Sequence, residues 1–161
     1  MKYDIKRCSY LECPNGWDGW IDGKSVNLGC LYFEQNIAMS WYEAKDHCKA
    51  LRFEHLHDAH LVEIYDSTQD TFLKETILKI GNTKSWWTGL TDIETETLWR
   101  WNNTGNIATY LNWGKNQPDG APDPADCMAL WSPFTHNWAD NSCTLSNQAN
   151  QNIYAICQFS Y

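Results

Sequence analysis

The sequence predicts an α+β domain, because helical periodicity is confined to its first half and short strand-like segments fill the second. Residues 40–51 and 67–80 carry apolar side chains at helical spacing. Beyond Trp86, short apolar segments alternate with Asn, Gly, Asp and Pro, which is typical of strands and loops. The 161 residues suffice for one domain, so we expect an N-terminal arm at 1–12 and a single domain at 13–161.

Both predicted helices have recognisable ends. The first begins at a capping box formed by Ser40 and Glu43, and its spacing turns Cys48 toward the core. The second begins near Ser67 and ends at Gly81. The predicted buried stripes comprise Trp41, Ala44, Cys48 and Leu51 in the first helix and Phe72, Leu73, Thr76 and Ile77 in the second.

The strand-like segments are short and rich in aromatic residues. An N-terminal hairpin is expected where the turn-rich stretch 16–24 precedes the first of them. Trp87 and Trp138 are expected in the core, because tryptophans at strand positions usually bury their rings. The segments are 30–33, 60–65, 99–101, 110–113, 128–131 and 154–157.

Composition excludes several classes of partner. The formal net charge of −8 repels phosphate backbones and anionic lipid, so we expect no nucleic-acid partner. No apolar run reaches the roughly 18 residues that a membrane span needs. Residues 1–10 are polar and lack the apolar core of a signal peptide, which we interpret as a mature or trimmed chain.

Cysteine usage indicates an oxidising compartment. The seven cysteines lie far apart and include no Cys-x-x-Cys pair, so the spacing of zinc ribbons and thioredoxin-like motifs is missing. Disulfide bonds fit this pattern better, and we expect a secreted, extracellular protein. One Asn-x-Thr acceptor sequence at 102–104 agrees with secretion, although such triplets are common by chance.

Enzymatic chemistry lacks a recognisable set of residues. The sequence contains no Gly-x-Ser-x-Gly, His-Glu-x-x-His or phosphate-binding glycine loop, so we expect a binding module rather than an enzyme. The His-rich stretch 54–60 has imidazoles that suit zinc or copper. A solvated loop before a strand is the alternative interpretation of that stretch.

Several landmarks follow one another in a characteristic order. They are Cys13-Pro14, Cys30-Leu31-Tyr32, Trp41 with Ala44 and Cys48, Trp87-Thr88-Gly89-Leu90, Gln117-Pro118-Asp119, Asp126-Cys127, Trp138-Ala139-Asp140, Cys143 and Cys157. In this order they resemble a C-type lectin domain, from Cys13 to about Phe159. The resemblance implies the C-type lectin-like fold, in which two helices flank antiparallel sheets and a long irregular binding loop is stapled by disulfides.

Spacing alone leaves the pairing of the seven cysteines open, with on the order of a hundred connectivities. Cys8 lies outside the family pattern, and an odd thiol in a secreted protein favours an intermolecular bond, hence a disulfide-linked homodimer. A capped or free thiol is the alternative. The pairs that the resemblance implies are Cys13–Cys30, Cys48–Cys157 and Cys127–Cys143.

The resemblance also implies a calcium site in the turn-rich stretch 112–141, which holds all but one of the five prolines. Ca²⁺ takes about 6–8 oxygen ligands and tolerates irregular loops. In this family the site is built around a triplet like Gln117-Pro118-Asp119, whose X-Pro bond is typically cis. Taken singly, such a triplet is common in surface turns. The oxygen ligands available here are Gln117, Asp119, Asp123, Asp126 and Asp140.

Two departures from the family pattern weaken this site. Ala125 stands where an acidic ligand is usual, and Ala139 replaces an Asn, so two side-chain oxygens are missing. We therefore expect weakened calcium binding unless other acids or water substitute. A second calcium position implied by the family uses Asp92, Glu96 and Asp126, all of which are present.

The Gln-Pro-Asp order resembles the galactose-type version of the loop, which makes galactose or N-acetylgalactosamine the expected glycan. Two vicinal hydroxyls of the sugar would complete the calcium shell while bonding to the same side chains. An aromatic face is also usual, and Trp131, Phe134, His136 and Trp138 could supply it. The expected sugar-binding residues are Gln117, Asp119, Trp131, His136 and Asp140.

The sequence therefore predicts a secreted, calcium-dependent lectin that recognises glycans on cells or microbes, as in innate immunity. Valency through Cys8 would offset a weak single site by avidity. The alternative is a domain of the same fold whose calcium site has decayed and which binds a protein partner or ice. Ala125 and Ala139 favour that alternative.

Overall fold

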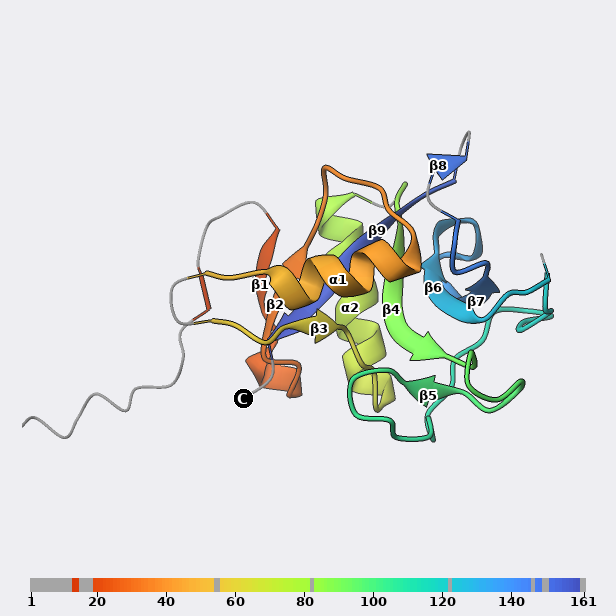
Figure 1. The fold of residues 1–161 in the computed structure, drawn as a ribbon. Coiled ribbons are helices and arrows are strands. Elements are labelled where there is room, and N and C mark those ends of the chain that lie inside the picture. The colour runs from red at the N-terminus through yellow and green to blue at the C-terminus, as the bar shows by residue number, and fades with distance from the viewer. Residues whose placement is uncertain are drawn as a thin grey trace, which may run out of the picture.

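A computed structural model describes most of the protein, and Figure 1 shows its arrangement. The described residues are 13–14, 19–53, 56–81, 83–121, 123–145, 147–148 and 151–159. In chain order the elements are β1 (Trp20–Asp22), η2 (Lys24–Val26), β2 (Cys30–Phe33), α1 (Trp41–Ala50), β3 (His60–Leu61), α2 (Ser67–Ile80), β4 (Ser85–Thr91), β5 (Arg100–Trp101), β6 (Cys127–Trp131), η3 (Ser132–Phe134), β7 (Asn137–Asn141), β8 (Asn147–Gln148) and β9 (Gln151–Phe159).

Helix α1 begins at the predicted capping box. Ser40 Oγ accepts a hydrogen bond from Glu43 N (3.2 Å), and the Glu43 carboxylate accepts one from Ser40 N (2.8 Å). Both bonds satisfy N–H groups that have no partner inside the helix. Trp41 and Cys48 are buried as predicted, whereas Leu51 lies just outside the helix as its C-cap.

Helix α2 also agrees with the prediction. Its N-cap is Asp66, whose side chain accepts a hydrogen bond from Gln69 N (2.8 Å). The helix ends at Gly81, whose φ of 138° favours glycine. The predicted stripe is buried at Leu73, Thr76 and Ile77 and half-buried at Phe72.

The strands form one mixed sheet in the order β1-β2-β9-β4-β6-β7. Strand β3 pairs with β9, β5 with β4, and β8 with β9. The expected antiparallel pairing holds for every described pair except β4 and β9, which run parallel. The long connection between these two strands allows β9 to return in the same direction as β4.

The central strands divide their side chains between two hydrophobic clusters on opposite faces of the sheet, as a period-2 pleat requires. On β9, Ala155 and Cys157 face the cluster that contains α1, whereas Ile156 faces the cluster that contains α2. On β4, Trp87 and Trp86 divide in the same way. Both faces of the sheet are therefore buried, which explains why these strands are apolar without alternation.

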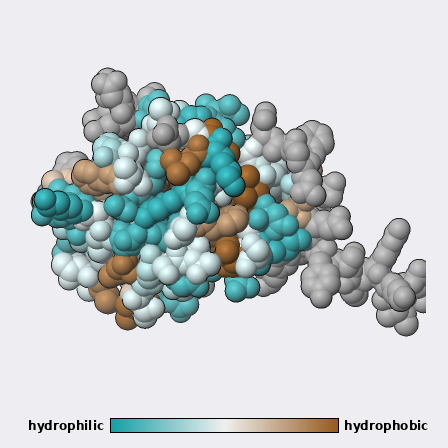
Figure 2. All heavy atoms as spheres, turned by 180° about the vertical axis from the view of Figure 1, so that it is seen from behind, coloured by the Kyte–Doolittle hydropathy of each residue, from teal (hydrophilic) through white to brown (hydrophobic). Residues whose placement is uncertain are grey.

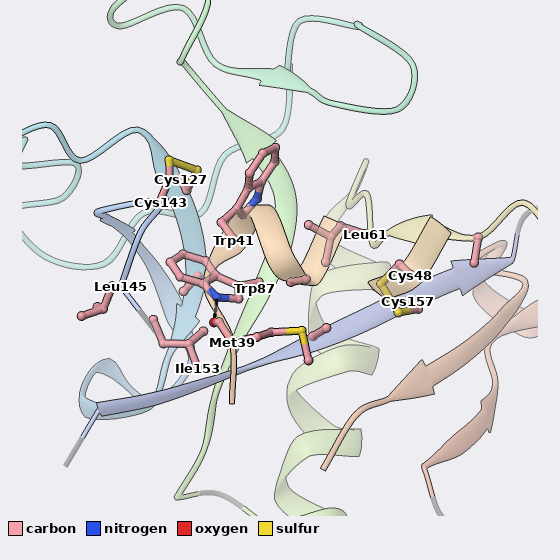
Figure 3. Packing of buried hydrophobic residues seen from close by; sticks show 14 of the residues in the cluster. Met39, Trp41, Cys48, Leu61, Trp87, Cys127, Cys143, Leu145, Ile153 and Cys157 are labelled. Carbon is pink, nitrogen blue, oxygen red and sulfur yellow. Dashed lines mark hydrogen bonds between the residues drawn. A yellow bond between two sulfur atoms is a disulfide. The ribbon is translucent and has the colours of Figure 1, made fainter. Parts of the chain in front are cut away.

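The α1-side cluster is built around two tryptophans, which Figure 3 shows between α1, β4 and β9. Trp87 Nε1 donates to Met39 O and Trp41 Nε1 to Thr88 O, both at 2.8 Å. These bonds satisfy the only polar atom of each buried indole. Trp87 and Trp138 are both fully buried, so the prediction that they are core residues is confirmed.

The expected N-terminal hairpin is present, because β1, which lies within the turn-rich stretch 16–24, pairs with β2. Two other sequence-predicted strands differ from the structure. Of the predicted strand 60–65 only β3 is regular, because Val62 N bonds to Ile156 O (3.0 Å) while Val62 O accepts from Gly89 N (2.9 Å). The chain thus leaves β9 at Val62 and continues beside β4. Segment 110–113 forms no strand apart from an isolated bridge between Trp113 and Trp138.

All three expected disulfides are present: Cys13–Cys30, Cys48–Cys157 and Cys127–Cys143. The second joins α1 to β9 over a sequence separation of 109 residues. Cys8 and the predicted arm 1–12 lie outside the described residues. Among the described helices, none has the length and apolar character to cross a membrane.

Candidate functional site

The triplet Gln117-Pro118-Asp119 lies in a long segment between β5 and β6 that is fixed to β7. Gly114 N donates to Trp138 O (2.8 Å), and Gln117 N donates to Gly114 O (3.0 Å). The Gln117–Pro118 peptide bond is cis, as the resemblance implied. We call residues 117–121 the binding loop. Its start is therefore positioned by hydrogen bonds to the edge strand of the sheet.

Asp140 of β7 closes the binding loop. Its Oδ1 accepts a hydrogen bond from Asp119 N (2.9 Å), and its Oδ2 accepts one from Gly120 N (2.8 Å). Asp140 is 3% exposed, and burial raises its pKa, while the two backbone N–H bonds favour the charged form. The carboxylate of Asp140 thus holds the loop backbone directly.

Gln117 and Asp119 are side by side. Gln117 Nε2 donates to Asp119 Oδ2 (3.0 Å), and Asp119 Oδ1 accepts from Ala121 N (2.9 Å). Gln117 Oε1 is buried and accepts no hydrogen bond within the described part of the chain. Buried oxygens normally have a partner, so this orphaned oxygen beside a carboxylate is a suitable ligand for a hard cation.

The other residues expected at this site contribute less. Ala125 is 5% exposed and Ala139 is 3% exposed, and neither offers a side-chain oxygen. Asp123 is exposed and makes no side-chain hydrogen bond or ion pair with the described residues. Asp126 belongs to a different acidic group. The structure therefore brings Gln117, Asp119 and Asp140 together and leaves the set of oxygens smaller than calcium prefers.

The second acidic group consists of Asp92, Glu96 and Asp126, whose ligand oxygens lie within 4.8 Å of one another. Asp92 Oδ2 accepts from Thr97 N (2.9 Å), whereas its buried Oδ1 has no partner among the described residues. Burial, together with the charges of Glu96 and Asp126, raises the pKa of Asp92 to about 6. The three carboxylates, one of which has an oxygen without a partner among the described residues, fit a divalent cation. Such a cation would neutralise their mutual repulsion.

Comparison with known proteins identifies the family of this chain. The family described as "Lectin C-type domain" matches residues 37–159. This chain belongs to the C-type lectin domain family. It is 28% identical over 134 residues to a perlucin-like protein of Mytilus galloprovincialis, covering 83% of this chain and 77% of that relative.

Two further similarities support the same family. The chain is 30% identical over 152 residues to the C-type lectin lectoxin-Lio3 of Erythrolamprus poecilogyrus, covering 91% of this chain and 81% of that one. Its fold is similar to the carbohydrate-recognition domain of the human scavenger receptor C-type lectin, with a TM-score of 0.72 and 27% identity over 93% of this chain and 100% of that one. The chain is thus a C-type lectin domain, which is a non-enzymatic binding fold.

Sequence reasoning missed a residue that fixes the segment leading to the binding loop of this C-type lectin domain. Asp70 of α2 is 2% exposed and accepts hydrogen bonds from Tyr110 OH (3.1 Å), Asn112 Nδ2 (2.6 Å) and Trp138 Nε1 (2.9 Å). Lys74 Nζ lies 3.1 Å from Asp70 Oδ2. The available signal was a carboxylate at i−3 and i−7 from the buried Leu73 and Ile77, on the apolar face of α2.

The aromatic side chains expected at the sugar site are mostly buried in the lectin domain. Trp131 is 8% exposed, and His136 is 3% exposed with its Nε2 at 2.9 Å from Lys84 O. Burial lowers the pKa of His136. Phe134 is the exposed one of the four, at 37%, and its ring lies beside Gly114. The structure thus leaves one exposed aromatic ring near the base of the binding loop.

The His-rich stretch forms no metal site within the described residues. His57 Nδ1 contacts the Asp58 carboxylate, and His60 Nδ1 contacts Leu61 O. Among the described residues, the Asp92 group is the single set of three His, Cys or acidic side chains with converging ligand atoms. Residues 54 and 55 lie outside the described part.

Proposed function

We propose that this C-type lectin domain binds galactose-type glycans in a calcium-dependent manner through the binding loop and Asp140. The observation that carries the proposal is the orphaned Gln117 Oε1, which lies beside the Asp119 carboxylate in a loop closed by Asp140. Bound calcium would supply coordination positions for two sugar hydroxyls. The Gln-Pro-Asp order supports galactose or N-acetylgalactosamine as the ligand class.

The side chains have separate tasks in this proposal. Gln117 and Asp119 would face the cation and the sugar hydroxyls. Asp140 would bind the cation while keeping the loop backbone in place through Asp119 N and Gly120 N. A second calcium at Asp92 and its neighbours would support the loop, since Asp126 O also accepts from Asp92 N (3.1 Å). Extra support is useful because the first site has few oxygens.

Phe134 would supply the aromatic face for the sugar. Its ring is exposed, and a side chain on Gly114 would contact Phe134 Cδ2 at 3.1 Å. Gly114 in turn bonds to Gln117, so the ring lies near the start of the binding loop. We leave Trp131 and His136 out of the proposed sugar site because their rings are buried. Replacing Phe134 by Ala should weaken galactose binding by about 1 kcal/mol, measured by calorimetry.

The setting of this activity is also part of the proposal. The disulfide-rich lectin domain is consistent with the extracellular space, and we propose that the protein is secreted. Binding to cells or microbes would benefit from two sites per molecule, which an intermolecular Cys8 disulfide would provide. Non-reducing electrophoresis of the protein and its Cys8→Ser variant tests this, and a monomer band for the unaltered chain contradicts it.

Calorimetry tests the lectin activity. The protein is titrated with N-acetylgalactosamine and with mannose, each in calcium and in chelator. We expect binding heat only in the titration with N-acetylgalactosamine in the presence of calcium. The double variant Gln117→Glu with Asp119→Asn should move the preference toward mannose. Asp123→Asn serves as the matched control, because it removes an exposed carboxylate near the loop and should leave the calcium and sugar affinities unchanged. If this variant loses as much affinity as the double variant, the proposed set of ligands is wrong.

A calcium-independent partner is the second candidate. It is favoured by Ala125 and Ala139, which offer no oxygen, and by the fact that both oxygens of Asp140 already accept backbone hydrogen bonds. The face shown in Figure 2 is mostly hydrophilic with small separate apolar areas, so a broad apolar interface is not found there. Absence of sugar heat in every condition, with activity in an ice-recrystallisation or protein-capture assay, would favour this candidate.

A further inference from the structure

The Asn-x-Thr acceptor sequence forms an exposed turn directly after β5. Asn102, Asn103 and Thr104 are all exposed. The backbone of the turn is fixed, because Asn102 N donates to Gly89 O (2.8 Å) and Gly105 N donates to Trp101 O (2.7 Å). The side-chain amide of Asn102, in contrast, makes no hydrogen bond with the described residues. Its Nδ2 is therefore available on a rigid, solvent-facing turn.

A buried carboxylate holds this turn from the side of the core. Glu63 is 2% exposed, and its Oε2 accepts from Asn103 N (3.2 Å) and Thr104 N (3.4 Å). Its Oε1 accepts from Thr104 Oγ1 (3.2 Å). The hydroxyl that the acceptor sequence requires is thus engaged in the folded protein. Modification of Asn102 before this turn has folded would leave that hydroxyl free for recognition.

Asn102 lies between two shallow hollows along α1. One, of about 210 Å³, is lined by Trp41, Tyr42 and Trp101 with charged residues at its edge. The other, of about 370 Å³, is lined by Lys49 and His60 among other polar residues. Asn102 and Lys45 border both. Pockets that enclose a drug-sized ligand measure roughly 300–1,000 Å³. The first hollow is smaller than this and the second is close to the lower limit, so both are small for an enclosed ligand.

We propose that Asn102 carries an N-linked oligosaccharide whose innermost sugars cover the two hollows beside α1. Asn102 Nδ2 forms a bond to C1 of the first sugar, supplied by a polyprenyl diphosphate-linked oligosaccharide. The bond from C1 to the diphosphate oxygen breaks, the diphosphate leaves with the bonding electrons, and a base takes the amide proton. Aromatic and polar walls on either side offer the sugar rings apolar and hydrogen-bonding contacts.

This modification would divide the surface of the lectin domain. The α1 side, where the turn after β5 lies, would be closed to protein partners. The binding loop would remain open, because Figure 1 shows the segment between β5 and β6 running from this turn, away from α1, to the right-hand side of the view beyond β7. The inference does not depend on which glycan the binding loop recognises.

Secretion from eukaryotic cells tests the modification. The protein should lose mass on treatment with peptide:N-glycosidase, with deamidation at position 102. Asn102→Gln should abolish the shift, and the neighbouring Asn103→Gln, which keeps the acceptor sequence, should retain it. Thr104→Ser should also retain it, because a serine hydroxyl still completes the sequence. An unshifted wild-type protein, or a shift that persists in Asn102→Gln, overturns the proposal.

Lysine acetylation tests the covering of the hollows. Lys45 should react severalfold more slowly in the glycosylated protein than after enzymatic removal of the oligosaccharide. Lys79, exposed near the end of α2, is the internal control and should react equally in both forms. Equal reaction of Lys45 in the two forms would overturn the covering, even where the oligosaccharide is present.

Discussion

Replacing Asp70 by Asn tests whether α2 holds the binding loop. The carboxylate of Asp70 accepts hydrogen bonds from Tyr110, Asn112 and Trp138 and pairs with Lys74. The substitution keeps the shape of the side chain and one oxygen. It replaces the other oxygen with an NH₂ group, which cannot accept from its present donors and does not attract the ammonium of Lys74.

The magnitude follows from the number and kind of bonds lost. Hydrogen bonds to a charged group contribute about 1.5–3 kcal/mol each. Tyr110 OH and Asn112 Nδ2 both use Oδ2, and the Lys74 pair is lost with the charge. Removing one partner of a fully buried ion pair costs about 3–5 kcal/mol, but the Lys74 side chain is 22% exposed, so the loss of its pairing costs less than that. We expect a loss of about 3–4 kcal/mol, which in a domain of this size lowers Tm by roughly 10 °C.

Thermal unfolding in the presence of chelator measures this loss, with Glu75→Gln as control. Glu75 is exposed on the same helix, so its neutralisation removes the same charge and should change stability by less than about 0.5 kcal/mol. Hydrogen exchange then locates the effect. Amides at 110–121 and 137–141 should exchange faster in the Asp70→Asn variant, whereas those of α1 should not.

Two outcomes would refute the reasoning. If the Asp70→Asn and Glu75→Gln variants unfold at the same temperature, the buried network contributes little. If exchange rises equally in α1 and in segment 110–121, Asp70 stabilises the domain as a whole and does not anchor the loop in particular.

Three further predictions follow. Because the pKa of Asp92 is raised above its unfolded value, its protonation stabilises the calcium-free protein at low pH, and this contribution is lost as pH rises through about 6. Asp92→Asn should reduce the loss of stability between about pH 5 and pH 8, measured by thermal melts in chelator. An unchanged loss of stability would contradict the role given to Asp92. Ala139→Asn should raise calcium affinity about tenfold by calorimetry, with about 1–3 kcal/mol less stability from overpacking; unchanged affinity would place the cation elsewhere. Replacing Cys48 and Cys157 by Ala should cost about 5 kcal/mol in denaturant unfolding, since the bond closes a loop of over a hundred residues; a loss below about 1 kcal/mol would contradict the loop-entropy argument.

The helices show what local sequence can predict. The capping box of Ser40 and Glu43 and the stop at Gly81 depend on residues within one turn of the helix ends. Their prediction from sequence is correct for that reason. The expected disulfide pairs and the cis bond before Pro118 are also present, but they came from the family resemblance, because spacing alone left the pairing open.

The candidate site was predicted only in part. Gln117, Asp119 and Asp140 meet as expected. Trp131 and His136 do not present exposed rings, because β6 and the turn after it put both side chains inside. No periodicity in this short hairpin distinguishes an inward from an outward aromatic residue.

The sequence by itself determined the two helices, the strand-rich second half and the turn-rich stretch that carries Gln117. These depend on hydrogen bonds and apolar spacing between neighbours in the chain. Only the tertiary structure decided that Asp70 meets Asn112 and Trp138, which lie 42 and 68 residues away in sequence. Such contacts are set by how α2 packs on the sheet, and packing between distant segments has no local signature.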